Sequence, residues 1–297
     1  MCYLRLITFY RLITLFFFYN IFSQEDFSNK ISSIKLTYDS LFLKKNYRFV
    51  LNDSLKKIIS HRISKEITQL LKETNNFFTS FTDLPFINSL YSPDSLIRII
   101  TWYYKDSENN YKYEGLLLKK NQENNNFSIY NLTQKFYNHK DTSFLFSTIH
   151  FKEWLGCIYY DILKFSTNKK VYYLLFGWDG YNKYLNRKIV DVLYFKKGTP
   201  YFGLPIFIDI NKTYYRLVFN YSEKANFVCK YVKEKNSIII DYLSPVCQDL
   251  KNFNEFYVPD GTYDGYTFSN GKWYYKKNII IKNLEEQKRM KKLKNKK

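Results

Sequence analysis

The order of apolar and polar residues divides the chain into a short helical part and a long β-rich part. In the first part, Asn52-Asp53-Ser54 can cap a helix, and the apolar residues after it recur at three- and four-residue steps. These residues, which we expect on one buried face, are Leu55, Ile58, Ile59, Ile63, Ile67, Leu70 and Leu71. A weaker pattern of the same kind over residues 31–42 predicts an earlier helix.

After Leu96 the pattern changes to short runs rich in Ile, Val, Tyr and Phe, which are separated by turn residues. The spacing of these runs is too short for helical crossovers and therefore predicts antiparallel pairing. Ser269-Asn270-Gly271 is typical of a tight hairpin, because Asn and Gly accept positive φ angles. The predicted strands are Ile97–Tyr104, Tyr113–Lys119, Phe127–Leu132, Cys157–Phe165, Val171–Phe176, Lys188–Phe195, Tyr201–Ile208, Tyr214–Tyr221, Phe227–Val232, Ser237–Tyr242, Tyr266–Phe268 and Trp273–Tyr275.

These patterns predict an α+β fold that is mostly β. Many strands in one domain must close, stack or curl, which leaves an antiparallel meander shaped as a barrel, a sandwich or a propeller-like sheet. We divide the chain into a leader (residues 1–23), a helical N-terminal segment (24–93), a β-rich domain (94–281) and a basic tail (282–297).

The first 23 residues have the pattern of a secretory signal peptide. Arg5 and Arg11 precede an apolar run over residues 12–22, and a polar segment follows. The apolar run is too short for a permanent membrane span, since a ~30 Å hydrocarbon layer needs ~20 residues. We therefore expect an exported protein of the periplasm or outer envelope, with cleavage after Ser23; an uncleaved anchor is the alternative.

Export bears on the cysteines, because disulfides persist outside the cytoplasm. Cys157, Cys229 and Cys247 follow the leader, and Cys229 with Cys247 is the nearer pair. Three is an odd number, so at least one thiol stays free or pairs between chains. A Cys229–Cys247 disulfide is one prediction, and buried apolar thiols are the other.

The formal net charge of +19 and the aromatic share of 21% first suggest nucleic-acid binding. The charge is spread along the chain, however, and only eight of the 46 basic residues are arginine. Scarce Ala, Arg, Gly and Pro with abundant Lys, Asn, Ile, Phe and Tyr indicate an AT-rich genome. We expect no nucleic-acid partner, and contact with a membrane only through an uncleaved leader or weakly through the tail, whose charge is +6.

Candidate chemistry is sparse. In Pro259–Gly265, Asp260 and Asp264 alternate with glycines, and hard oxygen ligands on a bent backbone are what calcium requires. Two turns closed by Asp side chains are the alternative interpretation, and no other cofactor is predicted. Trp178 and Asp179 lie in a glycine-flanked loop, where an exposed Trp could stack on a sugar or peptide or cover the edge of the core.

A series of segments follows one another in a fixed order from Trp154 onward. They are Trp154–Tyr160, Leu175–Gly180, Lys188–Leu193, Tyr201–Pro205, Arg216–Tyr221, Ile240–Pro245, Val258–Gly265 and Gly271–Trp273. This succession resembles a family of uncharacterised exported proteins of Bacteroidetes-type Gram-negative bacteria. The earlier strand Leu96–Trp102 also fits, whereas Lys105–Asn110 stands where the family has a Gly-Gly-rich turn. The resemblance implies export and supplies no reaction.

These observations predict an exported envelope or periplasmic protein that acts as a non-enzymatic binding or structural module. The sequence contains no HExxH, GxSxG or phosphate-cradling glycine motif. The alternative is a secreted hydrolase that uses carboxylates of the β-domain, such as Asp191, Asp209 and Asp241.

Overall fold

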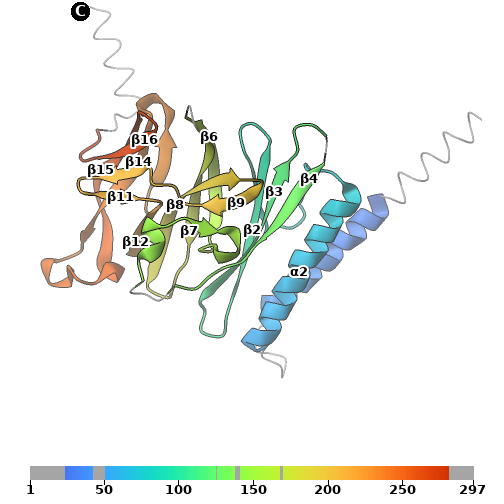
Figure 1. Ribbon diagram of the computed structural model, residues 1–297. Coiled ribbons are helices and arrows are strands. Elements are labelled where there is room, and N and C mark those ends of the chain that lie inside the picture. The colour runs from blue at the N-terminus through green and yellow to red at the C-terminus, as the bar shows by residue number, and fades with distance from the viewer. Residues whose placement is uncertain (1–23, 43–50, 125, 138–140, 168–169, 281–297) are drawn as a thin grey trace, which may run out of the picture.

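The computed structural model describes residues 24–42, 51–124, 126–137, 141–167 and 170–280, and the predicted leader and basic tail lie outside them (Figure 1). Two helices and three sheets form four successive layers: the helices, a first sheet, a central sheet and a third sheet. This confirms the mostly β, α+β class. Among the described strands no sheet closes into a barrel, and the stacked sheets are sandwich-like.

The first sheet has the order β1-β2-β3-β4 and consists of β1 (Asn88–Tyr91), β2 (Ile97–Lys105), β3 (Tyr111–Lys120) and β4 (Phe127–Leu132). The central sheet has the order β5-β9-β8-β7-β6, with β12 also paired to β8. Its strands are β5 (Ile149–His150), β6 (Ile158–Ser166), β7 (Val171–Asp179), β8 (Leu185–Lys196), β9 (Thr199–Phe202) and β12 (Leu217–Ser222).

The third sheet has the order β11-β10-β16-β15-β14-β13. Its strands are β10 (Phe207–Asp209), β11 (Lys212–Tyr214), β13 (Cys229–Val232), β14 (Ser237–Pro245), β15 (Tyr257–Ser269) and β16 (Lys272–Lys276). Among the described strand pairs, only β10 with β16 is parallel. The short 3-10 helices are η1 (Ser40–Phe42), η2 (Ser143–Phe146), η3 (Phe151–Glu153), η4 (Lys233–Lys235), η5 (Gln248–Leu250) and η6 (Asn254–Phe256).

The predicted helices are present, with a difference at the start of the second. A first helix covers residues 24–39, and α2 (Asp53–Thr74) begins after Asn52, whose side chain caps the Leu55 amide at 2.8 Å. The middle and end of α2 are buried on the first sheet as expected, but Leu55 and Ile58 are exposed. Polar contacts hold the first turn instead, because Asp53 accepts hydrogen bonds from Ser107.

Most predicted strands match observed ones within a few residues, and the Asn270-Gly271 hairpin turn has the expected positive φ angles of 50° and 77°. Four differences stand out. β1 lies inside the segment predicted as helical, the run Tyr201–Ile208 is divided between β9 and β10, and Tyr214–Tyr221 between β11 and β12. The strand predicted over Tyr266–Phe268 is longer, because β15 begins at Tyr257 and includes the segment Pro259–Gly265 that we expected to be a bent loop. Gly203, with a φ of 91°, begins the break between β9 and β10.

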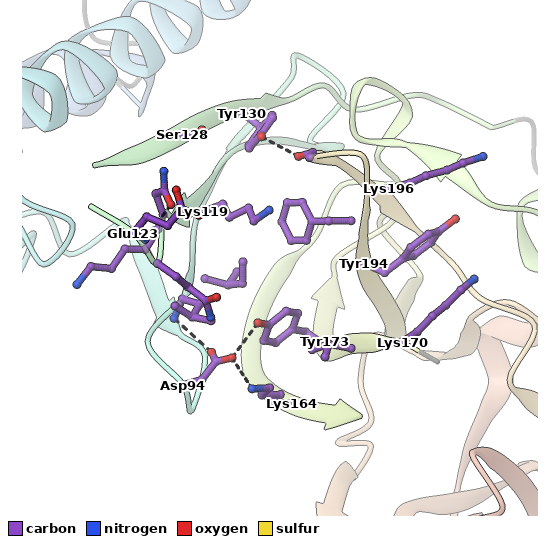
Figure 2. A pocket seen from close by; sticks show the side chains of 18 residues that line it. Asp94, Lys119, Glu123, Ser128, Tyr130, Lys164, Lys170, Tyr173, Tyr194 and Lys196 are labelled. Carbon is purple, nitrogen blue, oxygen red and sulfur yellow. Dashed lines mark hydrogen bonds and ion pairs between the residues drawn. The ribbon is translucent and has the colours of Figure 1, made fainter. Parts of the chain in front are cut away.

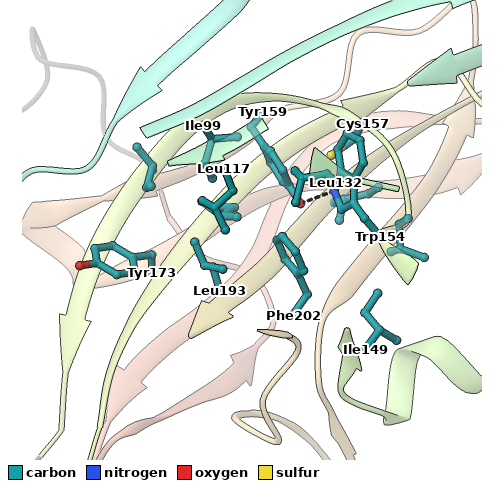
Figure 3. Close-up of a cluster of buried hydrophobic side chains, with 14 of the residues drawn as sticks. Ile99, Leu117, Leu132, Ile149, Trp154, Cys157, Tyr159, Tyr173, Leu193 and Phe202 are labelled. Atoms are coloured by element: carbon teal, nitrogen blue, oxygen red, sulfur yellow. Dashed lines mark hydrogen bonds between the residues drawn. The ribbon is translucent and has the colours of Figure 1, made fainter. Parts of the chain in front are cut away.

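The central sheet is buried on both faces, which explains the nearly continuous apolar runs of β7 and β8. The core between the first and central sheets is aromatic and aliphatic, and Figure 3 shows side chains filling it. Its one internal polar contact in that view is the indole of Trp154, which donates to the Tyr159 hydroxyl at 2.9 Å. This core therefore locks the two sheets together along their middle.

Arg98 on β2 is 1% exposed and forms no ion pair within the described residues. Its guanidinium donates to the Phe77 carbonyl at 2.8 Å, the Thr79 carbonyl at 2.7 Å and the Ser89 hydroxyl at 2.9 Å. The rings of Phe81 and Tyr91 lie 5.0 and 4.8 Å from its central carbon. Burial lowers the pKa of Arg98 to about 10, so it remains charged at neutral pH and ties the loop after α2 to the first sheet.

Arg216 makes a similar fork and is fully buried. It pairs with Asp191 on β8 at 3.1 Å and donates to the carbonyls of Phe144, Ser147 and Phe202. A Cβ atom on Gly203 would lie 2.5 Å from its Nη2, so glycine leaves the space that the guanidinium occupies. Arg216 thereby joins η2, β9 and the central sheet.

We predict that Arg98→Lys and Arg216→Lys each lower the free energy of unfolding by about 2–4 kcal/mol. Lysine keeps the charge but lacks the planar fork, so buried carbonyls lose their donors. Urea denaturation would measure the change, with Arg62→Lys as the control, because Arg62 is exposed and pairs only with Glu66. Values within about 0.5 kcal/mol of wild type for both buried variants would contradict this role.

Candidate functional site

The structure places Trp178 and Asp179 at the end of β7. The indole ring of Trp178 and the carboxylate of Asp179 both have partners within the protein. Trp178 is half-buried, with the ring of Tyr111 edge-on at 5.3 Å. Asp179 is 3% exposed and accepts from Nε of Arg187 at 2.7 Å. Asp179 lines a cavity of about 570 Å³, and Arg187 neutralises its carboxylate. Ligand binding by Trp178 and Asp179 stays a prediction.

Asp260 and Asp264 both lie on β15, with different surroundings. Asp260 accepts from the Thr262 amide at 2.8 Å and the Thr262 hydroxyl at 2.7 Å, which is the local turn contact considered as the alternative. Asp264 is buried and accepts from the Tyr275 hydroxyl and the Asn278 amide. No group of three or more His, Cys, Asp or Glu side chains suited to a metal occurs among the described residues, and calcium binding stays an untested prediction.

The predicted Cys229–Cys247 disulfide is wrong. Cys229 and Cys247 are free thiols, the first buried and the second exposed. Cys229 pairs with Ile240 on β14, and Cys247 lies seven residues further along that chain. At about 3.3 Å per residue this separates the two Cα atoms by roughly 20 Å, whereas a disulfide needs about 4–7 Å. Cys157 is also a free, buried thiol, so the apolar interpretation holds for two of the three.

The carboxylates of Asp191, Asp209 and Asp241 have different surroundings. Asp191 is held by Arg216 inside the central sheet, whereas Asp241 on β14 accepts from the Val228 amide at 2.6 Å. Asp209 lies on a separate small cavity of about 220 Å³ beside Tyr214 and Tyr266. The contacts of Asp191 and Asp241 are those of structural carboxylates.

A cavity of about 990 Å³ opens where the first and central sheets separate beyond their shared core. The ends of β3, β6 and β8 and the start of β7 line it. Five lysines and two carboxylates give this wall a net charge of +3, and we call it the lysine cleft (Figure 2). The lysines are Lys119, Lys120, Lys164, Lys170 and Lys196, and the carboxylates are Asp94 and Glu123.

One lysine of the cleft is neutralised. Lys164 pairs with Asp94 at 3.0 Å, and the Tyr173 hydroxyl donates to the same carboxylate at 2.9 Å. Burial alone would favour the protonated acid, but hydrogen bonds from Ser92, Lys164 and Tyr173 hold the pKa of Asp94 below its ordinary value. Asp94 therefore stays ionised and fixes the floor of the cleft, as Figure 2 shows.

The other four lysines have no carboxylate partner within the described part of the chain. Three of them lie over aromatic rings instead: Lys119 over Phe195 at 4.5 Å, Lys120 over Phe78 at 5.5 Å and Lys170 over Tyr194 at 5.6 Å. A ring holds an ammonium group by its negative face without cancelling its charge. The cleft thus presents positioned, uncompensated positive charge.

Sequence reasoning missed this cleft. Its lysines lie on strands far apart in the sequence, and lysine is so common in this chain that no single one stands out. The available signal is Lys119-Lys120 directly after the apolar run of β3, where the alternation ends.

Another pocket, of about 440 Å³, lies between α2 and the first sheet and is lined by Glu114, Lys57 and His61. Glu114 on β3 is half-buried, and burial raises its pKa to about 7 although Lys57 acts in the opposite direction. A carboxyl group that exchanges its proton near neutral pH is what general acid–base chemistry requires. The nearby Asp106 is instead held ionised, since Asn110 and Lys112 donate to it.

No protein-family model, curated protein or solved structure matched the chain. None of the helices in the described ranges is both long and apolar enough to cross a bilayer. The resemblance to exported Bacteroidetes-type proteins therefore stays a prediction from the sequence.

We predict that Glu114 makes stability fall as the pH rises from about 4.5 to about 7. Below this range the carboxyl is protonated in both states; within it the unfolded chain ionises while the folded chain keeps the proton. Above about pH 7 the folded chain carries a constant penalty, on the order of 3 kcal/mol. Glu114→Gln should therefore be the more stable protein at pH 8 and equal to wild type at pH 4.

Urea denaturation at several pH values would measure this difference. Glu123→Gln is the matched control, because Glu123 is an exposed carboxylate of the lysine cleft. A pH-independent difference between wild type and Glu114→Gln would contradict the raised pKa.

Proposed function

We propose that the protein is an exported, non-enzymatic binding module of the bacterial cell envelope that holds an anionic ligand in the lysine cleft. The observation that carries this proposal is that four lysines without a carboxylate partner among the described residues line one cavity. The cavity of about 990 Å³ is at the upper end of the size range of ligand pockets. The leader pattern over residues 1–23 supports export.

The physical basis of the proposal is the cost of leaving like charges together. Lysines gathered around one cavity without counter-ions repel, and an anion in the cleft reduces that repulsion. The rings beneath them restrict where the ammonium groups lie, so less side-chain freedom is lost on binding. The filled core next to the cleft gives it a rigid floor.

The test is the binding of polygalacturonate to the full chain by isothermal titration calorimetry at physiological salt. We expect wild type to bind, and Lys119→Gln/Lys120→Gln/Lys170→Gln/Lys196→Gln to bind at least about tenfold more weakly, at a few-fold per exposed ion pair. The matched control removes four exposed lysines elsewhere, namely Lys65, Lys72, Lys224 and Lys230. An equal loss in both variants would assign binding to overall charge and overturn the cleft.

Hydrolysis is the second candidate function, and the Glu114 pocket is the observation that favours it. A protonated carboxyl beside Lys57 and His61 in a cavity can donate a proton to a leaving group. A panel of chromogenic esters and glycosides would test this, with turnover expected to fall about 100-fold or more in Glu114→Gln and to persist in Glu123→Gln. No turnover by wild type would remove this candidate.

A further inference from the structure

The four unpaired lysines of the cleft belong to two layers, the first and the central sheet, but they lie on three different faces of these sheets. Lys119 contacts Phe195, which packs on the core between the first and central sheets. Lys170 contacts Tyr194, the neighbour of Phe195, which packs on the opposite face of the central sheet. Successive residues of a strand point to opposite faces, so Lys196 shares the face of Tyr194. Figure 2 shows Lys170, Tyr194 and Lys196 projecting side by side.

Lys120 extends this arrangement in the other direction. It follows Lys119 on β3 and therefore points to the helix side of the first sheet, where it contacts Phe78. The positive charges form a line that runs across the strand ends, from the helix side of the first sheet to the far side of the central sheet. Stacked sheets are about 10 Å apart, so this line spans roughly 20 Å.

A single small anion cannot reach both ends of such a line. The ligand that uses all four lysines must be extended and must carry anionic groups at intervals along its length. The lysines are point charges that accept carboxylates from a range of directions, unlike the bidentate fork of arginine. Repeated carboxylates on a flexible chain fit this requirement.

The surroundings of the aromatic rings in the cleft favour an acidic polysaccharide over a nucleic acid as the ligand. Single-stranded nucleic acids bind by stacking bases on open ring faces. Here the rings of Phe195 and Tyr194 are covered by lysines, and Tyr194 is also stacked on Tyr201 at 5.9 Å. The exposed polar side chains of the cleft, Asn121, Gln122 and Ser128, suit the hydroxyl groups of a sugar.

We infer that the lysine cleft binds a linear acidic polysaccharide, one that carries a carboxylate on successive sugar units and crosses the ends of β3 and β8. This inference rests on the proposed function and adds the class and the direction of the ligand. Lys119 contacts the chain between the two sheets. Lys170 and Lys196 form an outer subsite that only a ligand of several units can reach.

The test compares galacturonate oligomers of two, four and eight units, with neutral oligosaccharides of equal length, polyphosphate and single-stranded DNA as competing ligands. We expect affinity for galacturonates to rise with length and to exceed that for the other three. Lys170→Gln/Lys196→Gln should leave dimer binding unchanged and weaken octamer binding about tenfold, at a few-fold per lysine. Lys119→Gln should weaken binding at every length, and Lys224→Gln/Lys230→Gln is the charge-matched control.

The outcomes separate this inference from the proposed function. Equal affinity for all lengths, with no effect of the outer variant, would overturn the extended ligand and leave an anion-binding cleft. Tighter binding of DNA or polyphosphate would overturn the polysaccharide class. Binding of none of these anions would overturn the proposed function as well.

Discussion

The fold depends on buried guanidinium groups whose hydrogen bonds go to backbone carbonyls. Arg98 closes the loop after α2 onto the first sheet, and Arg216 joins η2 and β9 to the central sheet. A buried cation is costly unless its donors are satisfied, so the loops that supply these carbonyls are fixed wherever the arginine is fixed. Of the four described arginines only Arg62 is exposed. Most of the other basic residues of the chain are lysines. Arginine is scarce in this chain, but it is present at the buried positions where a planar guanidinium group donates to several carbonyls.

The same layers that bury these arginines produce the cleft. The central sheet is covered on both faces, and its shared core with the first sheet occupies the middle of the strands. Towards the ends of β3 and β8 the apolar runs stop and lysines follow. Apolar packing thus determines the position of the opening, and the charged residues beyond it determine what the opening can attract.

Local signals explain which parts of the structure the sequence predicts. The Asn52 cap and the Asn270-Gly271 turn depend on adjacent residues and were predictable, as was most of the strand order. Contacts between distant residues were not. The parallel pairing of β10 with β16, the carbonyls around Arg98 and the assembly of the lysine cleft each join segments far apart in the chain. The disulfide prediction was wrong for the same reason, because Cys229 and Cys247 are near in sequence, but Cys229 lies beside Ile240 of β14 whereas Cys247 follows the end of that strand.

The parallel pair of β10 and β16 has a consequence for the order of assembly. β16 enters the third sheet between β15 and β10, so a strand close to the end of the chain occupies an inner position of that sheet. The hairpin of β10 and β11 joins its sheet only through β16. During synthesis the first sheet has all its strands once residue 132 has emerged, and the central sheet by residue 222. The third sheet stays divided until residues 272–276 are free, so its apolar face is the last to be covered and the most exposed to aggregation in an incomplete chain.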